Sequence, residues 1–220
     1  MKNICAVIAA RSGSKRVKNK NIRRFGKSSL LVRKIIQLKK IKILDDIYVN
    51  SNDNKILSIA KKNGAKIIKR EKKYATNYVK INDVYVNVVK KVPSKHIFFV
   101  HITSPFVKTK SMEDAIKKYF KLNKKKYDCL ASTSPVKKFL WFKNKAINYN
   151  PKKMPRSQDL PDFFYLNFAF NILTKKNILK YKNIIGKKIK PFHLDEIESF
   201  DIDNMEEFKL ANLIENKIKI

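Results

Sequence analysis

Near its start the chain carries the apolar run ICAVIAA (residues 4–10), which leads directly into the loop RSGSKRVKNKNI (residues 11–22). The run is typical of a buried strand, and the loop combines small residues with spaced cations. Backbone N–H groups of a loop rich in Gly and Ser form a concave anion site, and Arg and Lys add charge-assisted hydrogen bonds to phosphate oxygens. This stretch predicts a strand followed by a site for a polyanion such as a nucleoside triphosphate.

Apolar strand-like runs alternate with helix-like segments along most of the chain, which predicts an α/β fold with a mainly parallel sheet flanked by helices. We expect strands at residues 4–10, 47–49, 65–69, 97–100, 129–132 and around 191–194. We expect helices at residues 28–40, 53–62, about 82–91, 110–122, 175–181 and about 205–216, with further regular structure at 165–173. Asp53 is expected to cap the second helix, and Gly64 to follow its end.

The alternating pattern breaks between residues 135 and 161. This stretch is polar and contains prolines, with short aromatic runs around Trp141 and Tyr149. A long irregular segment inside a compact domain is commonly functional or a contact between subunits. We therefore expect one domain over residues 1–220, with residues 135–161 inserted in it.

The composition fits a globular protein. Hydrophobic residues make up 44% of the 220 residues, and no apolar run approaches the roughly 20 residues that span a bilayer. The first apolar run is short and passes directly into a charged loop, unlike a signal peptide. These features predict a cytoplasmic protein without a membrane span. Cys5 and Cys129 lie in strand-like runs, so we expect buried free thiols.

The chain is strongly basic, with 51 Lys and Arg against 18 Asp and Glu and a formal net charge of +33. A nucleic-acid partner is one interpretation, because basic surfaces bind phosphate backbones. The other is a compositional bias toward Lys, Asn and Ile. The lysines are spread along the whole chain, and no zinc-finger, helix-turn-helix or RNA-recognition pattern accompanies them. Nucleic acid is therefore not the expected partner, whereas a positive field would attract nucleotides and acidic sugars.

The loop cations Arg11, Lys15 and Lys20 follow the first strand, at the edge where open α/β sheets bind ligands. The alternative is a solvated basic loop in a lysine-rich chain. Gly13, between two serines, favours a binding site because it allows the backbone to approach a ligand closely.

Two carboxylates, Asp201 and Asp203, precede the last expected helix. In an extended strand they would face the same side, and such a pair can hold Mg²⁺, which bridges phosphate oxygens. The alternative is that Asp203 only caps the helix.

Three further segments are candidates for the site. Thr103 and Ser104 follow the strand at 97–100, and RSQDLP (residues 156–161) lies in the irregular segment. His101 ends a strand, where a lone His is more often a packed core side chain than a catalyst.

Together these segments resemble the acylneuraminate (CMP-sialic acid) cytidylyltransferase family over nearly the whole chain. The family's first motif, I-x-A-R-x-x-S-K followed by K-N, corresponds to IAARSGSK and KN. The other matching segments are SND at 51–53, REKKYA at 70–75, HITSP at 101–105, RSQDLP at 156–161 and SFDID at 199–203. The resemblance implies a sheet of the kind found in nucleotide-diphospho-sugar transferases.

The resemblance also implies an activity: transfer of CMP from CTP to an acidic sugar of the nonulosonic acid class, with release of pyrophosphate. The implied catalytic residues are Arg11, Lys20 and Asp201, and the implied Mg²⁺ ligands are Asp201 and Asp203. The implied nucleotide-binding residues are Arg11, Ser14, Lys15, Lys20, Asn21 and Arg70. The implied acceptor-binding residues are His101, Thr103, Ser104, Lys137, Arg156, Gln158 and Asn167. Lys137 and Arg156 match positions that a neighbouring subunit contributes, which implies a homodimer joined through residues 135–161.

Some positions depart from the family pattern. The family's glutamine is His101 here, and its N-G-A-x-Y segment reads NFAFN at residues 167–171. These positions are associated with the sugar, so we hypothesise an atypical acidic acceptor. Two other functions stay open: a nucleotidyltransferase of the same fold that uses another sugar or nucleotide, and a non-catalytic basic protein that binds nucleotides or nucleic acid.

Overall fold

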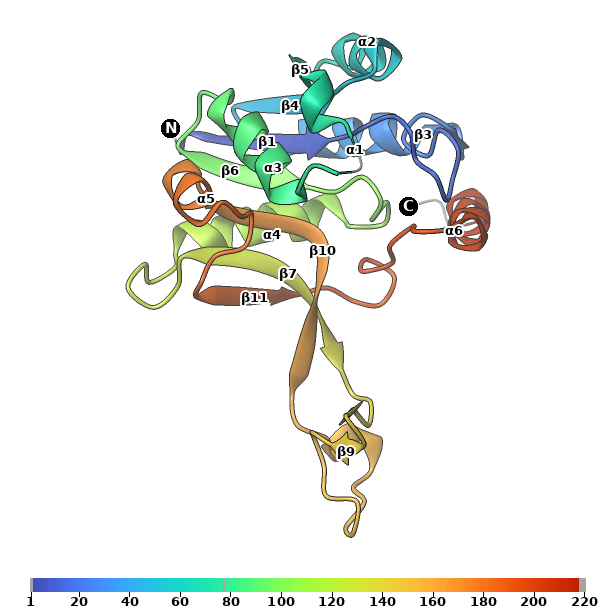
Figure 1. Cartoon of the computed structure of the whole chain (residues 1–220), viewed down its shortest axis with the longest axis vertical. Coiled ribbons are helices and arrows are strands. Elements are labelled where there is room, and N and C mark those ends of the chain that lie inside the picture. The colour runs from blue at the N-terminus through green and yellow to red at the C-terminus, as the bar shows by residue number, and fades with distance from the viewer. Residues whose placement is uncertain (1, 77, 218–220) are drawn as a thin grey trace.

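A mixed β-sheet lies at the centre of the fold, and helices cover both of its faces (Figure 1). The computed structural model describes residues 2–76 and 78–217. Within those residues the sheet has seven strands in the order β11-β7-β10-β6-β1-β4-β5. The strands are β1 (Ile4–Ala9), β4 (Asp46–Ser51), β5 (Lys66–Lys69), β6 (His96–Val100), β7 (Cys129–Val136), β10 (Phe163–Thr174) and β11 (Ile189–His193).

Most neighbouring strands run parallel. β1 pairs in parallel with β4 and β6, β4 with β5, and β7 with β11. β10 is antiparallel to both of its neighbours, β6 and β7. The predicted mainly parallel α/β sheet is therefore confirmed. β1 is almost wholly buried, as expected for a parallel strand covered on both faces.

The helices divide between the two faces of the sheet. One face packs against α1 (Leu30–Lys39), α2 (Asn54–Lys62) and α4 (Thr109–Phe120). The other face packs against α3 (Ile81–Lys90) and α5 (Lys175–Tyr181). The last helix, α6 (Met205–Lys217), lies beyond the carboxyl ends of β1 and β6 (Figure 1). There Phe208 and Ala211 pack against Val17, Phe25 and Ile202 in a third apolar cluster.

Local sequence signals explain the helix ends. Asp53 caps α2 by accepting hydrogen bonds from the N–H groups of Lys55 (2.7 Å) and Ile56 (3.2 Å). Gly64 follows the end of α2 with a φ of +89°, a conformation that favours glycine. Both positions agree with the expectation. The expected helices are all present, with ends that differ by a few residues.

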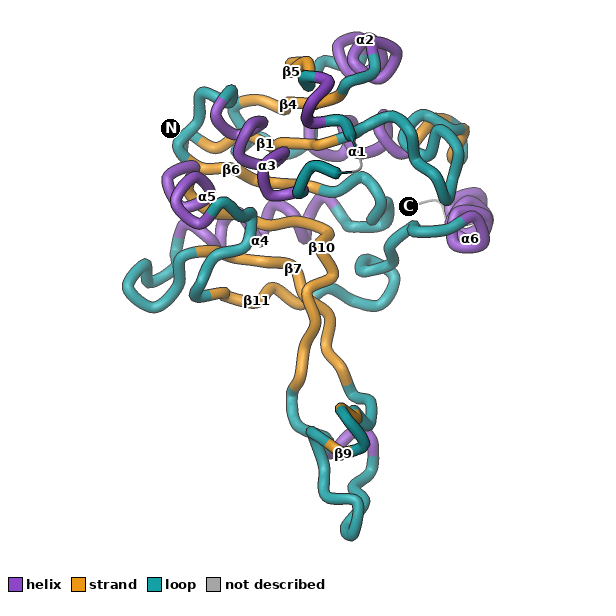
Figure 2. Tube along the Cα trace, viewed as in Figure 1, coloured by secondary structure: helices purple, strands orange, loops and turns teal. Residues whose placement is uncertain are grey.

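The inserted segment forms an arm that projects from the body, and we use this name for residues 135–164 (Figure 2). β7 runs past the expected end at Ser132 to Val136, and β10 begins at Phe163, because the two strands pair beyond the body through Pro135–Phe164 and Val136–Phe163. Beyond this ladder lie a small hairpin of β8 (Trp141–Phe142) and β9 (Lys145–Ala146) and a short 3-10 helix (Ser157–Asp159). A second small hairpin, β2 (Arg24–Phe25) with β3 (Ser28–Ser29), precedes α1, and a 3-10 turn (Lys72–Tyr74) precedes α3.

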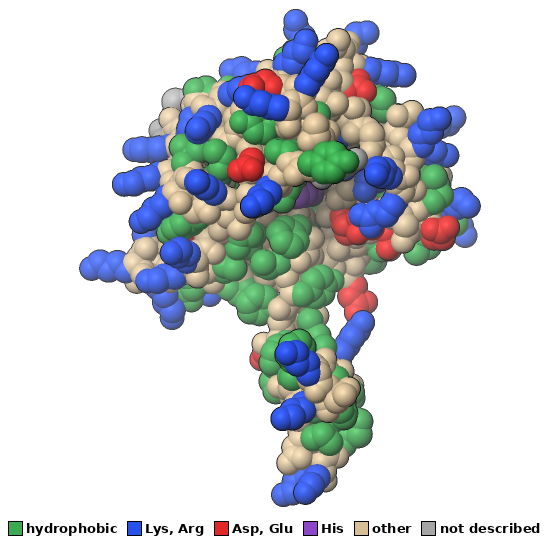
Figure 3. Space-filling model, viewed as in Figure 1, with side chains coloured by type: hydrophobic (Ala, Val, Ile, Leu, Met, Phe, Trp, Pro, Cys, Tyr) green, Lys and Arg blue, Asp and Glu red, His purple; other side chains and the backbone are tan. Residues whose placement is uncertain are grey.

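Three other expectations concern the membrane, the thiols and the charge. Within the described residues no helix has the length and apolarity to cross a bilayer. Cys5 and Cys129 are both buried and unpaired, as expected. Figure 3 shows Lys and Arg scattered over this face of the body and along the arm rather than gathered in one patch.

Candidate active site

The loop after β1 lines a cavity of about 400 Å³ at the carboxyl ends of β1 and β6. The structure brings together here five residues predicted from the loop sequence: Arg11, Ser14, Lys15, Lys20 and Asn21. The same cavity is also lined by His101 and Thr103, which follow β6, and by Asp203, which precedes α6. We call it the loop cavity. Its walls carry cations from one segment and a carboxylate from another, which suits a phosphate chain with a bound cation.

Hydrogen bonds to neighbouring segments hold the loop in place. The Asn52 side chain accepts from the Ser12 N–H (3.1 Å) and donates to the Ser12 hydroxyl (2.8 Å). The Asn21 side chain donates to the Arg11 carbonyl (2.8 Å). Gly13 has a φ of +80°, and a Cβ at this position would meet no atom within 4 Å. The backbone at Gly13 is therefore open to an approaching ligand.

Lys20 and Arg16 connect the loop to the segment that contains the two aspartates. The Lys20 ammonium donates to the Ile202 carbonyl at 2.6 Å, and Arg16 pairs with Asp203 at 3.0 Å. Burial lowers the pKa of Lys20, and the nearby carboxylates of Asp201 and Asp203 oppose that shift. The Arg16–Asp203 pair is exposed, so it is weak and can yield to a ligand. Arg16 lies in the loop, but it was not among the predicted site residues.

The two aspartates line different cavities, Asp203 the loop cavity and Asp201 a second one, and their segment is not a strand as expected. Residues 201–203 have no neighbouring strand in the described chain. The segment is held instead by the Ile202 N–H, which donates to the Thr103 carbonyl at 2.9 Å. Ile202 is buried while Asp201 and Asp203 are exposed on either side of it. The Ser104 hydroxyl donates to the Asp201 carboxylate at 3.3 Å, so Ser104, itself buried, supports this carboxylate.

Asn204, and not Asp203, caps α6. The Asn204 side chain accepts from the Glu207 N–H (2.9 Å), and the Glu207 carboxylate accepts in return from the N–H groups of Asn204 (2.9 Å) and Asp203 (2.6 Å). This reciprocal arrangement is a capping box. Since the cap is provided by its neighbour, the Asp203 side chain is left for another role.

The donor set fits Mg²⁺. Asp203 lines the loop cavity and Asp201 lines a second cavity, and both carboxylates are exposed, two residues apart in the chain. Across residues 2–76 and 78–217 no group of three or more His, Cys, Asp or Glu side chains is placed to hold a metal ion. Mg²⁺ commonly takes one or two carboxylates and completes its shell with phosphate oxygens and water. The pair therefore suits a cation that arrives with a phosphorylated ligand.

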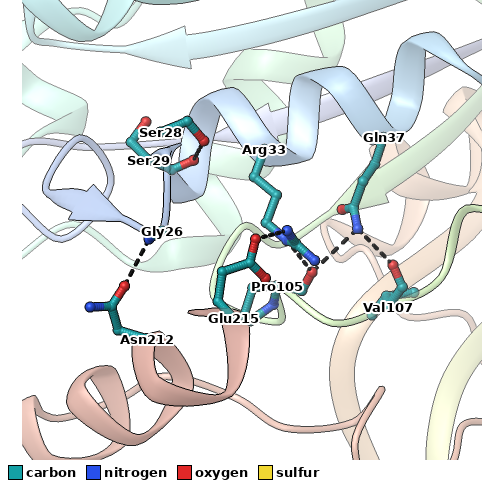
Figure 4. A network of polar contacts seen from close by, with 9 residues as sticks. All are labelled: Gly26, Ser28, Ser29, Arg33, Gln37, Pro105, Val107, Asn212 and Glu215. Atoms are coloured by element: carbon teal, nitrogen blue, oxygen red, sulfur yellow. Dashed lines mark hydrogen bonds and ion pairs between the residues drawn. The ribbon is translucent and has the colours of Figure 1, made fainter. Parts of the chain in front are cut away.

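The turn at residues 103–107, which supports the aspartates, rests on α1 (Figure 4). Arg33 donates to the Pro105 carbonyl at 3.0 Å and pairs with Glu215 of α6. Gln37 donates to the carbonyls of Pro105 (3.3 Å) and Val107 (3.0 Å). These contacts tie α1, α6 and the turn together. Lys34, fully buried on α1, donates to the Ser104 carbonyl at 2.9 Å, and sequence analysis did not identify it.

The second cavity, of about 800 Å³, lies at the foot of the arm, and we call it the foot cavity. Asn167 and Phe168 line it from β10, and Phe200 and Asp201 line it from the opposite segment. The Asn167 side chain accepts from the Ser132 hydroxyl (2.6 Å) and donates to the Ser134 hydroxyl (2.9 Å). In this arrangement Asn167 supports the cavity wall.

His101 stands beside both cavities, lining the loop cavity with its ring next to that of Phe168. Its Nε2 is buried and has no hydrogen-bond partner among the described residues. Desolvation lowers the pKa of His101 to about 4, although the charge of Asp201 opposes that shift. His101 is therefore neutral at pH 7.

Arg70 is buried and is not among the described residues that line the loop cavity. Its Nε donates to the Asn50 side chain at 2.6 Å. Burial and the positive charge of Arg11 lower the pKa of Arg70 to about 10, and the guanidinium remains charged at neutral pH. Arg70 lines a small cavity together with Asn52, which holds the loop.

Three predicted acceptor-binding residues lie on the arm, and none of them is among the described residues that line the loop or foot cavity. Lys137 donates to the Leu160 carbonyl (2.6 Å) and to Asp162 (2.7 Å). Arg156 pairs with Asp159 at 2.9 Å, and Gln158 is exposed in the short 3-10 helix. Within one chain these residues are not brought to the site.

The chain is similar to known proteins in sequence and in fold. Over 188 residues the chain is 29% identical to the pseudaminic acid cytidylyltransferase of Campylobacter jejuni, covering 80% of each protein. Over 207 residues it is 28% identical to the CMP-N,N'-diacetyllegionaminic acid synthase of Legionella pneumophila, covering 88% of each. Its fold is similar to that of a CMP:2-keto-3-deoxy-manno-octonic acid synthetase complexed with CTP. That match has a TM-score of 0.72 and 13% identity, and it covers 98% of this chain and 100% of the other. Residues 5–220 match the cytidylyltransferase family, and the chain therefore belongs to that family.

Proposed function

We propose that the protein transfers CMP from CTP to the anomeric hydroxyl of a nonulosonic acid and releases pyrophosphate. The relatives named above act on pseudaminic acid or make a CMP-legionaminic acid derivative, which supports an acceptor of this class. The observation that carries the proposal is the loop cavity itself. In this cavity the cations of residues 11–20 and the carboxylate of Asp203, from distant parts of the chain, line the same space.

In the proposed complex the triphosphate of CTP lies in the loop cavity. Arg11, Lys15 and Lys20 neutralise its charge, Ser14 and Asn21 line the floor, and Arg70 adds charge from the side. Positioning and charge neutralisation supply most of the catalysis in phosphoryl transfer, so these cations are the residues expected to act on the rate.

Asp201 and Asp203 would hold Mg²⁺ together with the phosphates. When bound, this ion would offset the negative charge of the phosphates and the charge that develops in the displacement. Ser104 keeps the Asp201 carboxylate in place, and Lys20 fixes the backbone between the two aspartates.

The acceptor would lie between the two cavities, beside His101, Thr103 and Asn167. Its anomeric oxygen forms a bond to the α-phosphorus while the bond from that phosphorus to the β-phosphate oxygen breaks. The hydroxyl proton leaves to solvent, and pyrophosphate departs. We also propose that the reaction takes place in the cytoplasm.

We further propose that residues 1–220 act as one domain and that the arm joins two copies into a homodimer. The arm exposes large apolar side chains: Trp141 is 57% exposed, Phe142 62% and Met154 67%. Apolar groups gathered on a projecting element mark an interaction surface. A partner's arm would then bring Lys137, Arg156 and Gln158 to the acceptor, whose carboxylate suits the two cations.

The proposal is tested by pyrophosphate release from CTP with a panel of nonulosonic acids and other acidic sugars. Release should require both the sugar and Mg²⁺, and ATP, GTP or UTP should not replace CTP. Asp201→Asn should abolish release, whereas Asp114→Asn, which changes a partly exposed carboxylate on α4 outside the proposed site, should not. Release by the Asp201→Asn protein, or none from wild type with any acidic sugar, would contradict the proposal.

A further inference from the structure

Phe168 occupies a backbone conformation that aromatic residues rarely adopt. Its φ is +55°, in the left-handed region, where a Cβ crowds the following carbonyl. The other described non-glycine residues with positive φ all have polar, non-aromatic side chains: Asn3, Asn19, Lys143, Asn144 and Lys182. Strained positions of this kind persist only where the surroundings hold them, and they gather at functional sites.

Buried hydrogen bonds on both sides hold Phe168 in this conformation. The register of β10 against β7 shifts between Leu166 and Asn171, so Phe168 lies in a bulge. On one side, Asn167 is fixed by the hydroxyls of Ser132 and Ser134. On the other, the Ala169 N–H donates to the Asn167 side chain (3.2 Å), and the Ala169 carbonyl accepts from the His101 N–H (3.0 Å). The bulge therefore dictates the backbone at Phe168, whatever its side chain.

The ring of Phe168 does not take part in the apolar core. It is 43% exposed and belongs to none of the three buried clusters of the described residues. It lines the foot cavity, and its centroid lies 6.4 Å from that of His101, which lines the loop cavity. The strained backbone thus supports an aromatic ring at the boundary of the two cavities. Asp201 lines the foot cavity together with this ring.

We propose that Phe168 is a specificity-determining residue whose ring is an apolar wall for the acceptor. Aromatic walls favour ligands that present C–H groups, such as a methyl, deoxy or acyl substituent, over ligands that present a hydroxyl at the same place. The inference rests on the proposed function. It adds that the enzyme selects, among acidic sugars, those with an apolar substituent facing β10.

The test compares Phe168→Gly and Phe168→Ala. Both remove the ring, but only glycine relieves the backbone, so the Gly variant should melt above the Ala variant by about 2–4 °C, the reverse of the usual order. The activity assay uses two acidic sugars that differ at one position, where one carries a methyl group and the other a hydroxymethyl group. In both variants the ratio of kcat/KM for the methyl sugar to that for the hydroxymethyl sugar should fall roughly tenfold. The KM for CTP should stay the same, and Phe168→Tyr should restore the ratio.

Lys182 provides a matched control. It has a φ of +50° after α5 and lines neither cavity of the described chain. Lys182→Gly should melt above Lys182→Ala in the same way, with the acceptor ratio of wild type. An active wild type whose ratio is unchanged in both truncated Phe168 variants overturns this inference alone. A wild type that uses no acidic sugar overturns the proposed function, and this inference with it.

Discussion

The ammonium of Lys20 donates a hydrogen bond of 2.6 Å to the backbone carbonyl of Ile202, 182 residues further along the chain. Ile202 lies between Asp201 and Asp203, so a loop cation fixes the segment that carries both carboxylates. Lys20 is half-buried and also lines the loop cavity. One side chain thus joins the proposed phosphate site to the proposed metal site.

Replacing Lys20 with Met should impair both binding and stability. The Ile202 carbonyl loses its donor, which costs about 1–3 kcal/mol, and the triphosphate loses a cation. We expect a lower Tm and a value of kcat/KM for CTP reduced by about tenfold or more. Lys18→Met, an exposed lysine on the same loop, is the control for the loss of charge. A lower Tm with normal CTP kinetics would mean that Lys20 is only structural.

The strand, the loop and the pair of aspartates were predictable because each signal is local. An apolar run of residues, small residues beside cations, and two carboxylates two positions apart are visible in a short window. The alternation of strands and helices predicted which elements lie at the same sheet edge. Placing residues 201–203 at the same site as residues 11–21 needed the family resemblance, because residues 201–203 are not a strand of the sheet.

Contacts between distant segments were not predictable from such windows. Nothing near Arg16 indicates that it pairs with Asp203, and Asn50 gives no sign that it accepts from the buried Arg70. The length of β7 also depends on β10, which pairs with it beyond the body. The cap of α6 could have been predicted, because Asn204 and Glu207 have the spacing of a capping box, but sequence analysis missed it.

The buried ammonium of Lys34 predicts a pH-dependent stability. Desolvation and the charge of Arg33 lower its pKa to about 7, against an unfolded value near 10.5. Below pH 7 the folded protein bears the cost of a buried charge. As the pH rises from 7 toward 10, the folded state releases the proton before the unfolded state does, and the protein gains stability.

Lys34→Met removes that cost together with the hydrogen bond to the Ser104 carbonyl. The Tm of the variant relative to wild type should therefore be highest at pH 6 and should decline by pH 9. Thermal unfolding at pH 6, 7, 8 and 9 measures it, with the exposed Lys40→Met as control. A Tm difference that does not depend on pH would show that the pKa of Lys34 is not lowered.

His101 should act on the shape of the site and not as an acid or base. Burial lowers its pKa to about 4, so across pH 6–8 the imidazolium that a general acid needs is absent and the neutral ring is a weak base. The pH profile of kcat should keep its form between pH 6 and 8 in His101→Gln. Because the unfolded state binds the proton near pH 6.5 and the folded state only near pH 4, wild type should also lose more stability than His101→Gln on acidification from pH 7 to 4. A limb near pH 6.5 that vanishes in the variant would contradict this assignment.

The arm residues allow a test of subunit sharing by complementation. If Arg156 of one subunit serves the site that contains Asp201 of its partner, Arg156→Ala and Asp201→Asn should each be nearly inactive alone. In a mixed dimer one site carries both substitutions and the other carries neither. Co-refolded equal amounts should therefore regain about a quarter of the wild-type activity, because half of the dimers are mixed and half of their sites are intact.

A control must show that the recovered activity comes from sites shared between two subunits and not from the mixing procedure. Asp201→Asn mixed with Lys20→Met provides the control, because both residues belong to the proposed site of the same subunit, where Lys20 binds the carbonyl next to Asp201, and no intact site can form. Phe142→Glu introduced into both chains adds a charge to the exposed apolar side of the arm, and it should prevent both dimerisation and recovery. Sedimentation measures the dimer, and pyrophosphate release measures recovery. Full activity of Arg156→Ala alone, or recovery in a protein that sediments as a monomer, would show that each site is complete within one chain.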